Sequence, residues 1–104
     1  MIKYQVLKKN DSITHVSVNG HALYDRSGKD IVCASVSTAI IVTVNALEAL
    51  GQNQTIDFVI EEGNFKLDVK NSNDIVKGLL NNLEYTLDEL KKQYPKYIKN
   101  QKER

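Results

Sequence analysis

The sequence predicts an α+β domain with the order β-β-α-β-β-α, in which two helices pack on a four-stranded antiparallel sheet. Two observations lead to this fold class. Apolar and polar residues alternate in four short segments, which form two pairs with a turn signal inside each pair. Each pair is followed by a longer segment whose apolar residues recur at helical spacing. The 104 residues suffice for a single domain (1–104) and are too few for two cores.

The four alternating segments predict two β-hairpins. In the first, Ile2, Tyr4 and Val6 lie before the turn signal Asn10-Asp11, and Val16 and Val18 lie after it. The second hairpin is the clearer one. Its strands are Ile56-Phe58-Ile60 and Phe65-Leu67-Val69, on either side of Glu62-Gly63-Asn64.

The two longer segments predict helices. Residues 31–50 contain neither Gly nor Pro and end at Gly51, a common helix stop. The β-branched run 40–44 is also typical of a strand, but twenty uninterrupted residues favour a helix. The second helix follows the capping groups of Ser72-Asn73-Asp74 and is closed by Pro95. Its apolar face comprises Ile75, Val76, Leu79, Leu80, Leu83, Leu87, Leu90 and Tyr94.

Composition and charge restrict the function classes. The net charge of +1 does not favour direct nucleic-acid binding, although residues 95–104 form a basic C-terminal tail. Such a tail solvates a chain end or contacts an acidic surface, ribosomal RNA included. The single cysteine excludes an internal disulfide and a four-cysteine metal site. The chain start lacks a signal-peptide core, and the longest apolar run (39–44) is too short to cross a bilayer. We therefore expect a cytoplasmic protein, not bound to a membrane, with a reduced thiol.

The segment from Gly20 to Ser37 contains the residues that can take part in a chemical reaction. Cys33 lies in the opening turn of the first predicted helix, where free N–H groups and the helix dipole favour a thiolate. The same N–H groups can stabilise an oxyanion. His21 lies at the end of the preceding strand, and the loop Gly20–Asp30 can fold it back onto the thiol as a base. These parts predict a nucleophilic acyl-transfer site.

Each of these residues also has an explanation without chemistry. Cys33 falls on the apolar stripe of its helix, a place where cysteine is often an inert core residue. His21 is equally typical of a solvated loop, and Asp30 of a helix N-cap. The hydroxyl of Ser37 commonly bonds back to the preceding helical turn. The residue types and their spacing leave these alternatives open.

The pattern of the whole segment resembles the signature of the ribosomal-processing cysteine protease family, Prp. The matching residues are Gly20-His21, Gly28, Asp30-Ile31-Val32-Cys33-Ala34 and Val36-Ser37. The resemblance implies that Cys33 is the nucleophile and His21 the base, with Asp30 and Ser37 as supporting residues. It also implies a homodimer without metal or cofactor. Members of the family remove a short N-terminal extension from the bacterial large-subunit ribosomal protein L-twenty-seven, after an apolar, Phe-rich segment.

The expected substrate peptide lies extended in a groove under the loop Gly20–Asp30. Gly20 and Gly28 near the loop ends allow it to open and close, and Leu23 and Tyr24 supply apolar contacts to a Phe-rich peptide. Two other classes stay open at this point. One is a non-catalytic ribosome-associated RNA-binding module that uses the basic tail. The other is a redox or thiol-transfer protein that uses Cys33.

Overall fold

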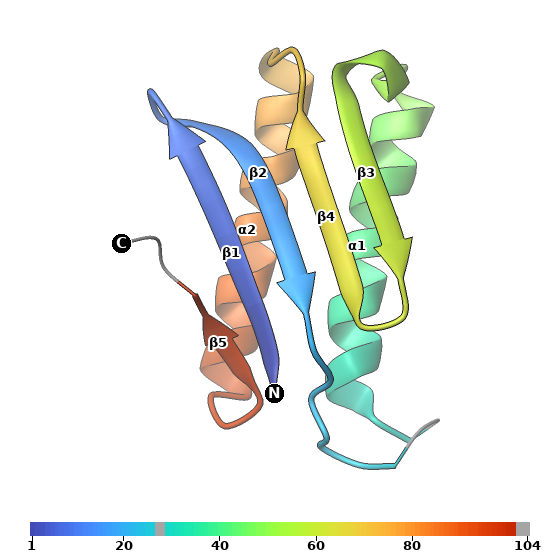
Figure 1. The fold of residues 1–104 in the computed structure, drawn as a ribbon, viewed down its shortest axis with the longest axis vertical. Coiled ribbons are helices and arrows are strands. Elements are labelled where there is room, and N and C mark those ends of the chain that lie inside the picture. The colour runs from blue at the N-terminus through green and yellow to red at the C-terminus, as the bar shows by residue number, and fades with distance from the viewer. Residues whose placement is uncertain (27–28, 102–104) are drawn as a thin grey trace.

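The computed structural model describes residues 1–26 and 29–101, so Gly28 and the last three residues of the basic tail lie outside the described residues. The elements follow the predicted order, with one short strand added at the end (Figure 1). They are β1 (Ile2–Lys9), β2 (Ser12–Asn19), α1 (Ile31–Ala49), the 3₁₀ turn η1 (Asn53–Thr55), β3 (Ile56–Glu61), β4 (Asn64–Val69), α2 (Asp74–Gln93) and β5 (Ile98–Asn100).

The sheet corrects one part of the prediction. It has five strands in the order β3-β4-β2-β1-β5 and is mixed, because β5 runs parallel to β1 while the other pairs are antiparallel. The prediction of a purely antiparallel, four-stranded sheet is therefore wrong in this respect. A three-residue strand is too short to show an alternation in sequence. It forms because Ile98, paired with Ile2, covers an edge of β1 that would otherwise stay open.

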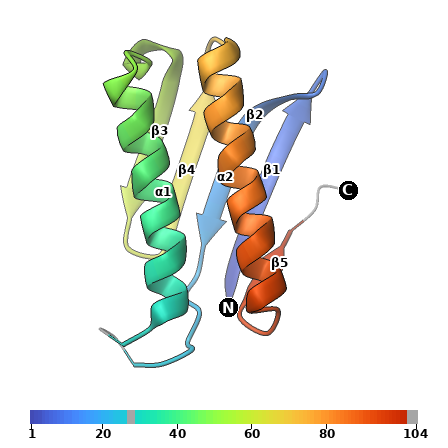
Figure 2. The ribbon, with the colours of Figure 1, turned by 180° about the vertical axis from the view of Figure 1, so that it is seen from behind.

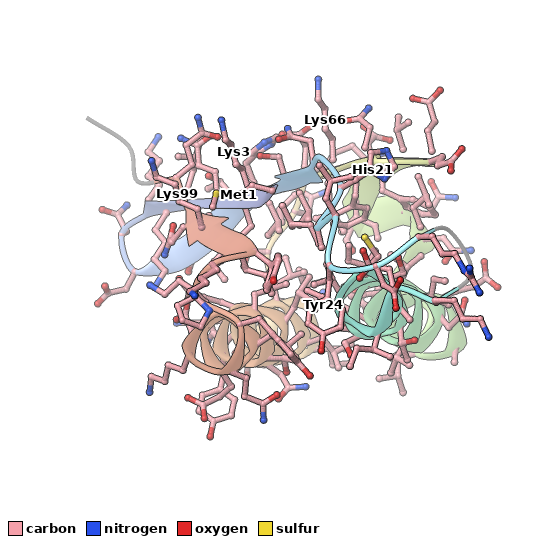
Figure 3. All side chains as sticks on the ribbon, turned by 90° about the horizontal axis from the view of Figure 1, so that it is seen from below. Met1, Lys3, His21, Tyr24, Lys66 and Lys99 are labelled. Atoms are coloured by element: carbon pink, nitrogen blue, oxygen red, sulfur yellow. The ribbon has the colours of Figure 1, made fainter. Side chains whose placement is uncertain are left out.

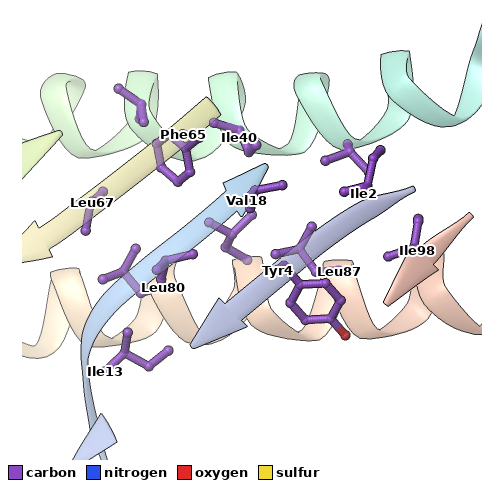
Figure 4. Close-up of a cluster of buried hydrophobic side chains, with 14 of the residues drawn as sticks. Ile2, Tyr4, Ile13, Val18, Ile40, Phe65, Leu67, Leu80, Leu87 and Ile98 are labelled. Atoms are coloured by element: carbon purple, nitrogen blue, oxygen red, sulfur yellow. The ribbon is translucent and has the colours of Figure 1, made fainter. Parts of the chain in front are cut away.

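Both helices lie on one face of the sheet (Figures 1 and 2). The core lies between the two layers and takes side chains from every strand of the sheet (Figure 4). The helices contribute the stripes that their spacing predicted, Val36, Ile40, Val44 and Leu47 from α1 and Val76, Leu80, Leu83 and Leu87 from α2. The opposite face of the sheet is open, and Figure 3 shows Lys3, Lys66 and Lys99 there.

One side of this layered structure stays apolar and exposed. The edge strand β3 buries only Ile56, while Phe58 and Ile60, expected on the half-buried face, are each 45% exposed. On α1, Ile41 and Val42 are also exposed. By length and composition α1 would suffice to cross a membrane, a test that core helices of soluble proteins pass as well. Here α1 buries one face against the sheet and α2.

The fold brings four segments together at one end of the molecule. The end of β2, the β3–β4 turn, the N-terminal residue and the start of α1 all lie at the lower end in Figure 1. The register explains part of this arrangement, because Asn19 at the end of β2 pairs with Asn64 at the start of β4. The loop that follows Asn19 must therefore cross beside the β3–β4 turn before it enters α1.

Candidate active site

A pocket of about 920 Å³ lies at this end of the molecule. Four segments line it: the edge of the core around Ile2 and Val18, the loop after β2, the first three turns of α1, and the β3–β4 hairpin from Ile60 to Phe65. Of the residues that the sequence singled out, Gly20, His21, Leu23, Asp30, Cys33 and Ser37 line the pocket. The structure thus brings the sequence-predicted catalytic pair into one cavity.

Cys33 is held between the core and the pocket. Its neighbours Val32 and Val36 are fully or almost fully buried, whereas Cys33 itself is half-buried. Its sulfur lines the cavity and accepts a hydrogen bond from the backbone N–H of Ala22 at 3.2 Å. Cys33 is therefore not sealed in the core, although it packs against it.

Asp30 is the N-cap of α1 and also holds the loop. One carboxylate oxygen accepts from the N–H groups of Val32 and Cys33 at 3.0 and 2.9 Å, and the other accepts from the N–H of Tyr24 at 3.0 Å. Burial would raise the pKa of Asp30, but the hydrogen bonds from Cys33 and Tyr24 outweigh it and lower the pKa below 3.8. A charged carboxylate at a helix N-terminus also gains from the dipole.

This capping changes one expectation about the helix start. The sequence predicted that free N–H groups in the first turn of α1 would bind an oxyanion. In the structure, the N–H groups of Val32 and Cys33 donate to the carboxylate of Asp30, and that of Ala34 donates to its carbonyl at 3.1 Å. These donors are occupied by the cap. The N–H of Ala22 is instead the backbone donor at the sulfur.

His21 is an exposed side chain on a well-anchored piece of backbone. The N–H of Gly20 donates to the carbonyl of Gly63 at 3.0 Å, and the Met1 nitrogen donates to the carbonyl of His21 at 2.5 Å. Gly20 is required here, since its φ is +96° and a Cβ would collide with the carbonyl oxygen of Met1. Within the described residues, no hydrogen bond joins the His21 ring to the Cys33 sulfur, so the predicted role of His21 as a base requires the ring to turn toward the sulfur.

The two apolar residues of the loop have different places. Leu23 lines the pocket with 77% of its surface exposed and a φ of +57°, an unusual conformation for a residue with a side chain. Tyr24 is not among the pocket residues. Its ring makes edge-to-face contacts with Tyr94 and Tyr97, at centroid distances of 6.0 and 5.1 Å. Tyr24 thus fastens the loop to the end of α2 rather than contacting the cavity (Figure 3).

Two further predicted residues have simpler positions. Ser37 lies one turn after Cys33, is exposed and lines the pocket. Within the described residues the Ser37 hydroxyl makes no hydrogen bond, whereas the hydroxyl of Ser35 donates to the carbonyl of Ile31. Gly28 lies outside the described residues.

The β3–β4 hairpin also lines the pocket, which the local sequence pattern did not indicate. Ile60, Glu61, Glu62, Gly63, Asn64 and Phe65 all line the pocket. The sequence predicts the turn at Glu62-Gly63-Asn64. Its place beside His21, however, depends on the pairing of β2 with β4, two strands between which the whole of α1 lies in the sequence. A local pattern carries no signal of that pairing.

Comparisons with known proteins point to one family. Residues 1–99 match the model of a family described as cysteine protease Prp. Two ribosomal processing cysteine proteases Prp, from strains of Staphylococcus aureus, are 29% identical over 89 residues, which cover 84% of this chain and 84% of each relative. The fold is similar to the crystal structure of the S. aureus Prp protease with a covalently linked product peptide, with a TM-score of 0.91, 25% identity and coverage of 99% and 100%. A Streptococcus mutans structure is 28% identical, with a TM-score of 0.79 and coverage of 99% and 96%.

Proposed function

This chain belongs to the family of cysteine protease Prp, and within that family we propose that it removes the short N-terminal extension of a bacterial large-subunit ribosomal protein, L-twenty-seven. The chain is a cysteine protease by family. The single observation that carries the assignment of residues is the position of Cys33, whose sulfur faces the pocket and accepts the N–H of Ala22. The S. aureus relative, which holds a covalently linked product peptide, supports a covalent mechanism.

In the proposed mechanism, the Cys33 thiolate attacks the carbonyl carbon of the scissile peptide bond and forms a tetrahedral oxyanion. The oxyanion collapses, the C–N bond breaks, and His21 gives its proton to the departing amine. The product left on Cys33 is a thioester. His21 then removes a proton from a water molecule, which attacks the thioester, releases the carboxylic acid and restores the thiolate.

We assign the stabilisation of the oxyanion to the N–H of Ala22. In the resting site this donor bonds the sulfur at 3.2 Å, which stabilises the thiolate. Once sulfur is bonded to the substrate carbon, its negative charge moves to the carbonyl oxygen next to it. The same N–H then lies beside the new charge, where one such donor contributes about 3–4 kcal/mol in other proteases.

The lining of the pocket supports an apolar substrate segment. Its apolar residues come from the core edge, α1 and the β3–β4 hairpin, and they include Ile40, Ile60 and Phe65. A pocket of this size, in which the apolar part of the lining surface exceeds the polar part, suits Phe-rich side chains. We propose that Leu23, exposed at the rim, adds an apolar contact from the loop.

We further propose that the protein acts in the cytoplasm as a homodimer. The exposed apolar residues of β3 and α1 support a dimer, because Phe58, Ile60, Ile41 and Val42 are each at least 45% exposed, and neighbouring exposed apolar side chains mark interaction surfaces. Analytical ultracentrifugation tests this part. We expect a dimer mass for the wild type and a monomer mass for Val42→Glu, and a monomeric wild type contradicts it.

A peptide assay tests the catalytic proposal. Purified protein is mixed with a peptide that contains an apolar, Phe-rich segment, and the products are weighed. We expect two products from one cut after that segment, no cut with Cys33→Ala, and a rate about 10²–10⁴-fold lower with His21→Ala. His15→Ala is the matched control, since the other histidine lies in β2 and pairs with Asp68. Cleavage by Cys33→Ala overturns the proposal.

A further inference from the structure

The β3–β4 turn contacts the proposed catalytic histidine. We propose that Gly63 is a positioning residue of the protease site: its missing side chain leaves the space in which the His21 imidazole lies, and this sets the place of the ring relative to Cys33. This inference rests on the proposed roles of His21 and Cys33. It adds a residue from the second hairpin to a site otherwise built from the segment 20–37.

A side chain added at Gly63 would collide with the ring of His21. A Cβ at this position would lie 2.7 Å from Nε2 of His21, 3.1 Å from Cε1 and 3.5 Å from Cδ2. The first distance is shorter than real Cβ contacts, so any side chain at this position forces something to move. The three nearest atoms are Nε2 and the two carbons bonded to it, which means that this corner of the imidazole lies against the glycine.

The backbone on both sides is less free to move than the ring. The carbonyl of Gly63 accepts the N–H of Gly20, and the flanking pair Glu61 and Asn64 closes the hairpin. The backbone N–H of Ala22, the residue after His21, donates a hydrogen bond to the Cys33 sulfur. The imidazole can rotate about its side-chain bonds, whereas a shift of the turn would break these contacts. A side chain at position 63 therefore displaces the ring and leaves the fold in place.

A second glycine provides a matched control. Gly51, at the end of α1, has a φ of +76°, close to the +72° of Gly63, so alanine meets the same backbone strain at both positions. An added Cβ at Gly51 meets no atom within 4 Å. Gly63→Ala and Gly51→Ala thus share the backbone effect and differ in the contact with His21.

The test measures the rate at which iodoacetamide alkylates Cys33 between pH 5 and 9, with peptide cleavage beside it. We expect Gly63→Ala to alkylate at least about ten-fold more slowly than wild type at pH 7 and to reach its full rate only at higher pH, because an imidazole displaced from its place beside Gly63 can no longer turn to the Cys33 sulfur. We expect kcat to fall and KM to stay near its wild-type value. Gly51→Ala should keep the wild-type profile and kcat, with a similar fall in Tm.

Proton NMR gives a readout that stability does not affect. The chain has two histidines, and His15→Gln assigns their ring signals. In Gly63→Ala the His21 signal should shift and the His15 signal should stay. If His21→Ala itself leaves alkylation and cleavage unchanged, the proposed function fails. If His21→Ala is impaired but Gly63→Ala behaves like Gly51→Ala in kinetics and spectra, the positioning role of Gly63 is wrong and the proposed function stands.

Discussion

The backbone N–H of Ala22 donates a hydrogen bond to the sulfur of Cys33 at 3.2 Å, although the two residues belong to different segments. Ala22 follows the proposed base His21 and is itself buried, so the loop after β2 is tied to the nucleophile by its own backbone. The state of the sulfur and the position of the loop are therefore coupled.

Alkylation of Cys33 should loosen this loop. A carboxamidomethyl group turns the sulfur into an uncharged thioether, which accepts only weakly from the N–H of Ala22, and it fills the space beside the sulfur. We expect faster hydrogen exchange at the amide of Ala22 in the alkylated protein, measured by mass spectrometry on peptides that cover 20–26. Cys33→Ser, which keeps an acceptor, is the control and should retain most of the protection. Equal exchange in the free and alkylated proteins contradicts the coupling.

Asp30 should matter for both stability and activity. Asp30→Ala removes the cap of α1 and the anchor of Tyr24, so we expect a loss of about 1 kcal/mol in the free energy of unfolding and a lower kcat/KM. Asn73→Ala is the matched control, because Asn73 caps α2 by accepting the N–H of Val76 at 2.9 Å. It should cost a similar stability in urea unfolding and leave kcat/KM unchanged. A fall of kcat/KM to the same degree in both variants would mean that Asp30 acts through stability alone.

The charge of Asp30 should make stability depend on acid pH. Folding lowers the pKa of this carboxyl below 3.8, so the folded state holds its proton more weakly than the unfolded state. Its contribution is then fully present above pH 3.8 and is lost as the pH falls through the folded pKa. We expect the difference in unfolding free energy between wild type and Asp30→Asn to shrink from pH 6 to pH 3. A constant difference over this range contradicts the assignment.

Tyr24 should restrain the loop from its far side. Its ring contacts those of Tyr94 and Tyr97, and edge-to-face pairs contribute about 0.5–1.5 kcal/mol each. Tyr24→Ala should therefore raise hydrogen exchange at residues 22–26 by about ten-fold. Tyr85→Ala removes an equally large ring that is 64% exposed on α2, and it should leave this exchange unchanged. An unaltered loop in Tyr24→Ala would show that the aromatic contacts do not hold it.

Leu23 should affect substrate binding more than chemistry. It lies at the pocket rim with 77% of its surface exposed, so a polar replacement has little effect on folding. Leu23→Asp should raise KM for a Phe-rich peptide several-fold with kcat nearly unchanged, as measured by initial rates over a range of peptide concentrations. Lys3→Gln, on the open face of the sheet, lowers the net charge by the same one unit and controls for it. An unchanged KM counts against the apolar contact.

The order of the main elements followed from local patterns. Alternation at Ile56 to Val69 and helical spacing from Val76 to Leu87 are each decided within a few residues, because a strand or a helix buries one face with its own period. The strand β5 could not be predicted in this way, because three residues are too few to show a period and Ile98 is buried by segments distant in sequence, β1 and α2. The ring contacts of Tyr24 could not be predicted from the sequence either, because they depend on where α2 ends in the fold.

By itself, the sequence determined which residues are available for the proposed chemistry: one cysteine at a helix start, one histidine at a strand end, and an aspartate suited to cap that helix. Only the tertiary structure decided how they meet. Pairing of β2 with β4 places Gly63 under the His21 ring, and the cap at Asp30 takes the helix-start N–H groups, which leaves Ala22 as the donor to sulfur. Residue type and local period are properties of neighbouring residues, whereas these contacts join segments that only the packed sheet and helices bring together.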